Sequence, residues 1–237
     1  MRQLLIAALV LLLPAAVQAQ LWSEDFDAYA NGQVLDGTAD DGGWKGWDNS
    51  SAWAAVVIND YSLSAPNSVM IDGAADLVHE FDVAGGSCSF SAWQYIPSFV
   101  DQGTTYFILL NQYTDGGPYI WSTQLAFDLG TGLLSDDLVA GDENMAIVRD
   151  QWVQIRVDLD LVNDLQNVYY NGSLLSSDTW THGDPNAQLA LEAVDLFANG
   201  VAGVYYDDLV LRCTQVPEPS LLLLSGVGLL ALLRRKK

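Results

Sequence analysis

The chain has 237 residues, of which 30 are acidic and 9 are basic, giving a formal net charge of −21. Between residues 20 and 216 the imbalance is larger still, because only four of the nine basic residues fall there. A surface of this charge repels other polyanions, so nucleic acid is excluded as a partner. The same charge favours solubility. Residues 20–215 are long enough to form one domain with a sizeable core.

The N-terminus, residues 1–19, predicts a secretory signal peptide. Arg2 provides the basic start, Leu4 to Leu13 provide an apolar run, and Ala19 completes a small-residue cleavage pattern. We therefore expect cleavage after Ala19. A first transmembrane helix is the alternative, but the run is short and is followed by Pro14.

Residues 20–215 predict an all-β domain, because stretches rich in β-branched and aromatic residues recur between Gly, Asn and Asp clusters. Strict alternation of apolar and polar residues over 152–160 indicates a strand with one buried face. Asn171-Gly172 predicts a hairpin turn, since both residues accept positive φ. So many strands favour a two-sheet jelly-roll sandwich. The expected strands are 53–58, 68–71, 77–81, 88–96, 105–111, 121–128, 152–160, 167–170, 189–196 and 204–212.

Cys88 and Cys213 are the two cysteines of the chain, and both fall in predicted strands. Their spacing is unlike a metal-binding Cys-x-x-Cys pair. They are candidates for one disulfide in an oxidising compartment, and the sequence leaves open whether their side chains meet.

Six short motifs follow one another along residues 20–215: Glu24-Asp25-Phe26, Gly43-Trp44, Trp93 to Pro97, Trp152 to Asp158, Tyr169 to Gly172 and Tyr206 to Leu209. Their order resembles the concanavalin A-like, laminin-G-like jelly rolls of bacterial surface proteins. The resemblance covers nearly the whole of residues 20–215 and implies an architecture more than an activity. In that superfamily the first and last strands commonly lie side by side.

That adjacency would bring together four carboxylates, which repel one another unless they are protonated or bridged by a cation. Hard oxygen ligands suit calcium, so we expect a structural Ca²⁺ as one interpretation. The other is that these side chains simply face water, since no fixed-spacing calcium loop is present. The expected ligands are Glu24 and Asp208, with Asp25 or Asp207. A second acidic cluster is interpreted as a solvated loop: Asp36, Asp40 and Asp41.

Known catalytic motifs are not found. Laminarinase-type members of the same superfamily carry Glu-x-Asp-x-x-Glu on one strand, a spacing that the five glutamates of this chain do not have. His79 and His182 form no zinc-binding helix, and neither cysteine has a neighbouring histidine. We expect a non-enzymatic protein. A hydrolase that uses a pair of its 25 aspartates stays open as the alternative.

Eight tryptophans and ten tyrosines favour a saccharide-binding role, because sugar rings stack on aromatic faces while carboxylates and amides hold their hydroxyl groups. The best candidates lie in or beside Gly, Asp and Asn-rich stretches. For any single tryptophan, burial in the core is the alternative. The candidate ligand-binding residues are Trp44, Trp47, Tyr113, Asp115 and Trp121.

Residues 216–237 combine three features. A proline motif comes first, and its prolines hold the chain extended. The apolar run of residues 221–233 predicts a transmembrane helix of about 20 Å, shorter than a hydrocarbon core of about 30 Å. Four cations follow and favour retention of that end on the cytoplasmic side. The motif is Val216, Pro217, Glu218, Pro219 and Ser220, and the cations are Arg234, Arg235, Lys236 and Lys237.

This tail resembles the PEP-CTERM sorting signal of Gram-negative bacteria. The resemblance implies an exported protein that is transiently anchored in the inner membrane and is cut near Pro217 by an exosortase. It also implies release or transfer to the cell surface, commonly with exopolysaccharide and biofilm material. The alternative for the tail is an ordinary membrane anchor. We expect a surface protein whose jelly roll binds or is embedded in polysaccharide, with a purely structural matrix protein as a further alternative.

Overall fold

The computed structural model describes residues 18–141 and 144–214. Most of the predicted signal peptide and all of the predicted sorting tail, residues 216–237, lie outside these ranges. Within them, no helix is long and apolar enough to cross a membrane.

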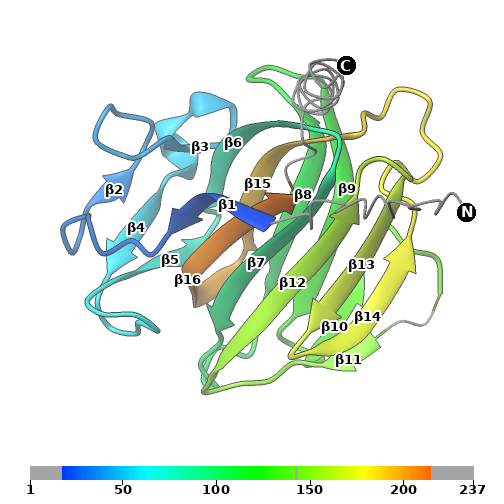
Figure 1. The fold of residues 1–237 in the computed structure, drawn as a ribbon. Coiled ribbons are helices and arrows are strands. Elements are labelled where there is room, and N and C mark those ends of the chain that lie inside the picture. The colour runs from blue at the N-terminus through cyan, green and yellow to red at the C-terminus, as the bar shows by residue number, and fades with distance from the viewer. Residues whose placement is uncertain (1–17, 142–143, 215–237) are drawn as a thin grey trace, which may run out of the picture.

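Two antiparallel sheets stack face to face, as Figure 1 shows, and confirm the predicted two-sheet sandwich. The nine-stranded sheet has the order β14-β13-β12-β7-β16-β5-β4-β2, with β1 also paired to β16. Its strands are β1 (Gln18–Glu24), β2 (Val34–Leu35), β4 (Ala55–Ile58), β5 (Ser68–Gly73), β7 (Ser87–Tyr95), β12 (Trp152–Asp160), β13 (Leu165–Tyr170), β14 (Ser173–Asp178) and β16 (Val201–Thr214).

The seven-stranded sheet has the order β11-β10-β9-β8-β15-β6-β3. Two short 3₁₀ turns, η1 (Trp47–Asn49) and η2 (Ser51–Trp53), follow its edge strand β3. Its strands are β3 (Trp44–Gly46), β6 (Asp76–Ala84), β8 (Thr104–Tyr113), β9 (Tyr119–Asp128), β10 (Leu133–Asp136), β11 (Asn144–Ala146) and β15 (Ala190–Asn199).

Side-chain alternation gives the strands their buried and outer faces. In β12, Val153, Ile155, Val157 and Leu159 are buried and the residues between them are partly exposed, as predicted. The predicted hairpin joins β13 to β14, with Asn171 at φ 50° and the next residue at φ 76°.

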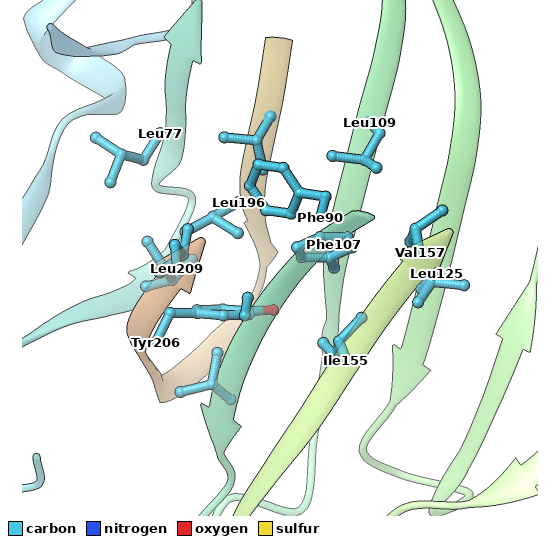
Figure 2. Packing of buried hydrophobic residues seen from close by; sticks show 14 of the residues in the cluster. Leu77, Phe90, Phe107, Leu109, Leu125, Ile155, Val157, Leu196, Tyr206 and Leu209 are labelled. Carbon is cyan, nitrogen blue, oxygen red and sulfur yellow. The ribbon is translucent and has the colours of Figure 1, made fainter. Parts of the chain in front are cut away.

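The hydrophobic core lies between the sheets. Figure 2 shows Phe90 and Ile155 from the nine-stranded sheet packing against Phe107 and Leu196 from the seven-stranded sheet. Tyr206 is buried there too, and its hydroxyl oxygen accepts a hydrogen bond of 2.6 Å from the Gln94 amide. The core polar groups that β16 contributes are therefore paired inside the sandwich.

Cys88 and Cys213 lie directly opposite one another on β7 and β16, with their Cα atoms 4.0 Å apart. A disulfide joins them. It connects residues 125 positions apart in the sequence and so ties the last described strand to the centre of the nine-stranded sheet.

A second, smaller hydrophobic cluster forms on the face of the seven-stranded sheet that points away from the core. It is built on Val78, Ile108, Leu110, Tyr113 and Ala193. Trp47, Tyr106, Tyr119 and Phe197 pack against it and remain partly exposed. Aromatic side chains thus gather on an outer sheet face, where apolar surface is unusual in a protein with no function there.

Candidate functional site

A cleft of about 490 Å³ opens on this outer face of the seven-stranded sheet. We call it the aromatic cleft. Strands β6, β8, β9 and β15 form its floor and turn η1 forms one side. Nine residues line it: Trp47, Asp76, Tyr106, Ile108, Tyr119, Trp121, Gln124, Asp195 and Phe197.

The period of two along each strand explains why these side chains meet. In β8, Phe107 and Leu109 enter the core, so Tyr106 and Ile108 point into the cleft. The same rule holds in β15, where Leu196 is in the core and Asp195 and Phe197 line the cleft. Register then sets the neighbours: Tyr106 lies opposite Phe197, and their rings stack with centroids 5.5 Å apart.

Three aromatic rings form the upper wall of the cleft. Trp47 lies with its ring centroid 4.7 Å from that of Tyr119, and it stacks on Trp121 at 6.3 Å with an angle of only 9°. Trp121 keeps 37 % of its surface exposed. An exposed indole face beside polar side chains is the usual platform for a sugar ring.

Turn η1 is held in place by Asp48, which adopts a left-handed φ of 55°. Its amide donates to the Tyr113 hydroxyl oxygen at 3.1 Å, and its carboxylate accepts from the Gly116 amide at 2.9 Å and from the Tyr119 hydroxyl. The two hydrogen bonds that the carboxylate accepts lower the pKa of Asp48, and the one from Tyr119 has the larger effect. A strained non-glycine residue with this many partners is typical of a site where the backbone is fixed to position a side chain, here Trp47.

Tyr113 and Asp115 support the wall from behind and do not line the cleft. Tyr113 is buried, and its ring packs edge-on against Trp47 at 5.0 Å. Asp115 accepts hydrogen bonds from the Tyr113 hydroxyl at 3.2 Å and from Lys45 at 2.7 Å. Lys45 also pairs with Glu80. Both predicted residues are therefore near the site, but their polar atoms are already bound within the protein.

Asp76 and Asp195 supply the carboxyl groups of the cleft floor. Asp76 pairs with Phe197 and Asp195 with Val78, so the two aspartates are diagonal neighbours on one face of the β6–β15 pair. Their carboxyl groups hydrogen bond to each other. Asp195 is 2 % exposed, and apart from this mutual bond the Oδ1 atoms of both residues have no hydrogen-bond partner within the described residues.

This burial changes how the pair ionises. Burial, together with the neighbouring charge of Asp76, raises the pKa of Asp195 well above its ordinary value. Burial also raises the pKa of Asp76, against the hydrogen bond with Asp195, which lowers it. Two neighbouring carboxyl groups cannot both ionise cheaply, and the fully buried Asp195 is the harder of the two to ionise.

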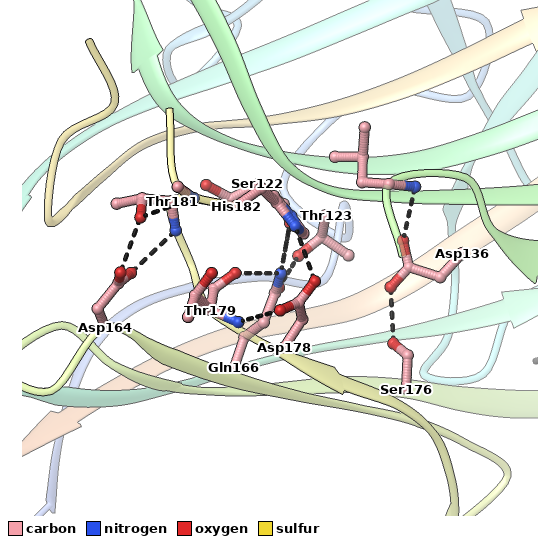
Figure 3. A network of polar contacts seen from close by, with 12 residues as sticks. Ser122, Thr123, Asp136, Asp164, Gln166, Ser176, Asp178, Thr179, Thr181 and His182 are labelled. Carbon is pink, nitrogen blue, oxygen red and sulfur yellow. Dashed lines mark hydrogen bonds and ion pairs between the residues drawn. The ribbon is translucent and has the colours of Figure 1, made fainter. Parts of the chain in front are cut away.

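A second hollow of about 310 Å³ adjoins the cleft and shares Tyr119 and Trp121 with it. On its far side are Leu138, Thr181, His182 and Asp184. Figure 3 shows how this side is fixed: a nitrogen of His182 lies 2.8 Å from the Ser122 carbonyl oxygen, and Thr181 donates to Asp164 through its amide and hydroxyl. The partly exposed Trp121 side chain therefore stands between the two hollows.

Trp44 was predicted as a candidate ligand-binding residue, with burial in the core as the alternative, and it is fully buried in the core. Its indole N–H donates to the Glu24 carboxylate at 3.2 Å, and its ring packs against Phe26. The glycine-rich context that suggested exposure has another cause. Gly43, at φ 96°, lies against the His79 ring, where a side chain would be crowded.

The acidic loop that precedes Trp44 is likewise only partly solvated. Asp41 is 1 % exposed, and its carboxylate accepts hydrogen bonds from the amides of Asp36, Gly37 and Thr38. Burial alone would raise the pKa of Asp41, but these bonds and the one from Gln33 outweigh it and lower the pKa. The interpretation of this cluster as a solvated loop was therefore wrong for Asp41, which organises the loop from inside.

Strand β1 does lie beside β16, with Glu24 opposite Leu209, yet the four carboxylates expected to hold calcium bind other groups. Glu24 accepts hydrogen bonds from Tyr29 and Trp44, and Asp207 accepts from the backbone amides of residues 63 and 64. In the described ranges, no three His, Cys, Asp or Glu side chains are grouped so as to hold a metal ion. The arrangement does not fit the expected four-carboxylate site of Glu24, Asp25, Asp207 and Asp208.

Sequence reasoning missed Asp76, Asp195 and Phe197, the residues of the cleft floor. One signal was available. Asp195 interrupts an apolar run in a predicted strand, and a charged residue at such a position is rarely buried without a purpose. Its partner could not be identified, because the pairing of β6 with β15 depends on the topology.

Two parts of the chain, the tail and the sandwich, are each similar to known proteins. Residues 215–237 match the family model of the PEP-CTERM protein-sorting motif. The chain carries a PEP-CTERM sorting motif. The match includes the predicted residues Val216 to Ser220 and the terminal cations, and the motif marks an exported protein that an exosortase sorts.

The sandwich is similar in fold to solved structures of other proteins. One is an endo-β-1,4-glucuronan lyase from the fungus Trichoderma reesei, with a TM-score of 0.52 and 10% identity over 83% of this chain and 96% of the lyase. Another is the cellulose induced protein Cip1, with a TM-score of 0.50 and 15% identity over 80% of this chain and 96% of Cip1. No curated protein matches the sequence. At these identities the likeness shows the jelly-roll fold alone.

Proposed function

We propose that this PEP-CTERM protein is a non-enzymatic surface or matrix protein that an exosortase cuts near Pro217, and that its jelly roll binds exopolysaccharide through the aromatic cleft. The observation that supports the binding role is the grouping of Trp47, Tyr119 and Trp121 in one cleft with Asp76 and the buried Asp195. Stacking surfaces and convergent polar groups in one concave site are the chemistry that holds a saccharide.

The chemistry of the carboxyl pair favours binding over hydrolysis. Glycosidases hold their two carboxyl groups about 5 to 9.5 Å apart so that the anomeric carbon, or a water molecule, fits between them. The carboxyl groups of Asp76 and Asp195 hydrogen bond directly, which leaves no such space. The pair suits recognition of hydroxyl groups.

A hydrolase is nevertheless the second candidate, because two carboxyl groups with raised pKa values lie in a cleft. The two functions differ in their products. A binder is retarded in a gel that contains a soluble polysaccharide, and it forms no reducing ends when it is incubated with that polysaccharide. Formation of reducing ends that stops in Asp195→Asn would replace the binding proposal with the hydrolase.

The sorting role is tested by the mass of the exported product. The chain is expressed in a host with and without an exosortase, with an epitope tag inserted in the exposed segment 38–40. We expect a C-terminus near residues 216–219 only when the enzyme is present. A product that ends at Lys237 in both hosts would contradict sorting and leave the membrane anchor as the explanation of the tail.

A further inference from the structure

We propose that the aromatic cleft takes an electrically neutral glycan, whose hydroxyl groups bond to Asp76 and Asp195 and whose chain continues over Trp121 into the second hollow. This inference rests on the proposed binding function and adds the class of ligand, its path and its polar contacts.

The charge of the site argues against an acidic polysaccharide. The nine residues that line the cleft include two aspartates and no Lys, Arg or His. The charge of the Asp48 carboxylate, which Tyr119 binds, also acts on Asp76. The nearby cation, Lys45, is already paired with Glu80 and Asp115. A uronate would thus enter an acidic site with no free cation to balance it, which is costly where water is displaced.

The unpartnered oxygen atoms of the floor require donors. Apart from the bond between the two carboxyl groups, no donor among the described residues reaches the buried Oδ1 atoms of Asp76 and Asp195, although both side chains line the cleft. A buried acceptor left without a donor costs free energy that a hydroxyl group recovers. Sugar hydroxyl groups both donate and accept, so they can satisfy the free oxygens of a protonated and an ionised carboxyl group.

The path of the chain follows from the shared wall. Tyr119 and Trp121 line both the cleft and the second hollow, and Trp121 is the more exposed ring. A glycan that bonds to the floor and stacks on Trp121 is directed toward Thr181 and His182. There the His182 ring is held by Ser122 and Asp178. The site therefore suits an extended chain better than a single sugar.

The test is calorimetric titration of the purified full-length chain with defined saccharides. The probes are neutral disaccharides and hexasaccharides of glucose, xylose and mannose, and hexasaccharides of glucuronic and mannuronic acid. We expect at least one neutral hexasaccharide to bind more tightly than its disaccharide, and no uronate to bind. Tighter binding of a uronate would overturn the inference and leave the proposed function standing, whereas binding of no saccharide would overturn both.

Substitution tests the polar contacts. Asp76→Ala should lower the affinity for the neutral hexasaccharide about tenfold or more, because a hydrogen bond to a carboxyl group is lost. The matched control is Asp101→Ala, at an exposed aspartate in the loop between β7 and β8, which should bind as the wild type does. If Asp76→Ala fails to fold, Asp76→Asn replaces it, with a weaker loss expected. Unchanged affinity in a folded Asp76 variant would overturn the role of the pair.

Discussion

The carboxyl group of the buried Asp195 hydrogen bonds to that of the half-buried Asp76 across the β6–β15 pair, and burial raises the pKa of both groups in the floor of the aromatic cleft. Apart from this mutual bond, the Oδ1 atoms of both side chains have no hydrogen-bond partner among the described residues. Folding retains this arrangement although it costs stability, which is the usual mark of a site kept for a ligand.

The first prediction concerns pH. Because the pKa of Asp195 is raised by folding, the native state holds a proton that the unfolded chain releases near pH 4. Its contribution to stability is full below that pH and is lost as the pH rises through the raised pKa. We expect Asp195→Asn, whose amide can still donate to Asp76, to be more stable than the wild type at pH 8 and to lose that advantage at pH 4. Urea unfolding at both values measures this.

The control for the pH prediction is Asp101→Asn, which removes an exposed charge elsewhere and should not change the pH dependence. An equal difference between Asp195→Asn and the wild type at both pH values would contradict the assignment of the proton.

The disulfide between Cys88 and Cys213 gives the second prediction. It closes a loop across a separation of 125 residues, and loops of that size stabilise a fold by about 4 to 5 kcal/mol through the unfolded state. Reduction should therefore lower the melting temperature of the wild type and leave that of a Cys88→Ser, Cys213→Ser double variant unchanged. A wild type that melts at the same temperature in both redox states would show that the bond does not constrain the fold.

Asp41 gives the third prediction. Its carboxylate accepts three backbone amide hydrogen bonds and a fourth from the Thr38 hydroxyl at 2.9 Å. Asp41→Ala should cost roughly 1 to 3 kcal/mol at neutral pH, because buried donors lose their acceptor. The neighbouring Asp40 is exposed, so Asp40→Ala should cost little.

The contribution of Asp41 to folding stability changes with pH in the opposite direction to that of Asp195. Its folded pKa is lowered, so its contribution is present above the unfolded value, near 4, and is lost as the pH falls through the folded value. The stability difference between Asp41→Ala and the wild type should therefore narrow in acid. A difference that stays constant to low pH would contradict a role for the ionised carboxylate.

Calcium provides the fourth prediction. Glu24 is bound to Trp44 and Tyr29, and Asp207 to the loop that contains Ser64, so a cation would have to displace these donors. We expect Ca²⁺ added to chelator-treated protein to give neither binding heat nor a rise in melting temperature. A stoichiometric heat that disappears in Glu24→Gln would restore the calcium site expected from the sequence.

The sequence pattern was sufficient to predict a strand wherever one face of that strand packs against the core. The alternation in β12 and the Asn171 turn both depend on local rules, so both were predictable. Short edge strands such as β2 and β3 were missed, because two or three residues leave no periodic signal. The tail was recognisable for a similar reason, since its motif is continuous in sequence.

Only some of the residues that line the cleft could be predicted from the sequence. Trp47 and Trp121 were identified from their polar context and do line it, whereas Trp44 has the same context and is buried. Local composition cannot distinguish them, because exposure depends on where the fold places each residue: Trp44 lies in β3 with its side chain in the core, whereas Trp47 lies in turn η1 beside the cleft. The meeting of Asp76 with Asp195 depends on the register of two distant strands, which no local pattern encodes.

The most direct test of the account is migration of the protein through gels that contain a soluble neutral polysaccharide. The wild type should be retarded, and Trp121→Ala should migrate as if no polysaccharide were present, because the shared wall of both hollows is removed. Trp152→Ala, at a partly exposed tryptophan on the outer face of the nine-stranded sheet, should be retarded like the wild type. Equal retardation of all three proteins would contradict binding through the aromatic cleft.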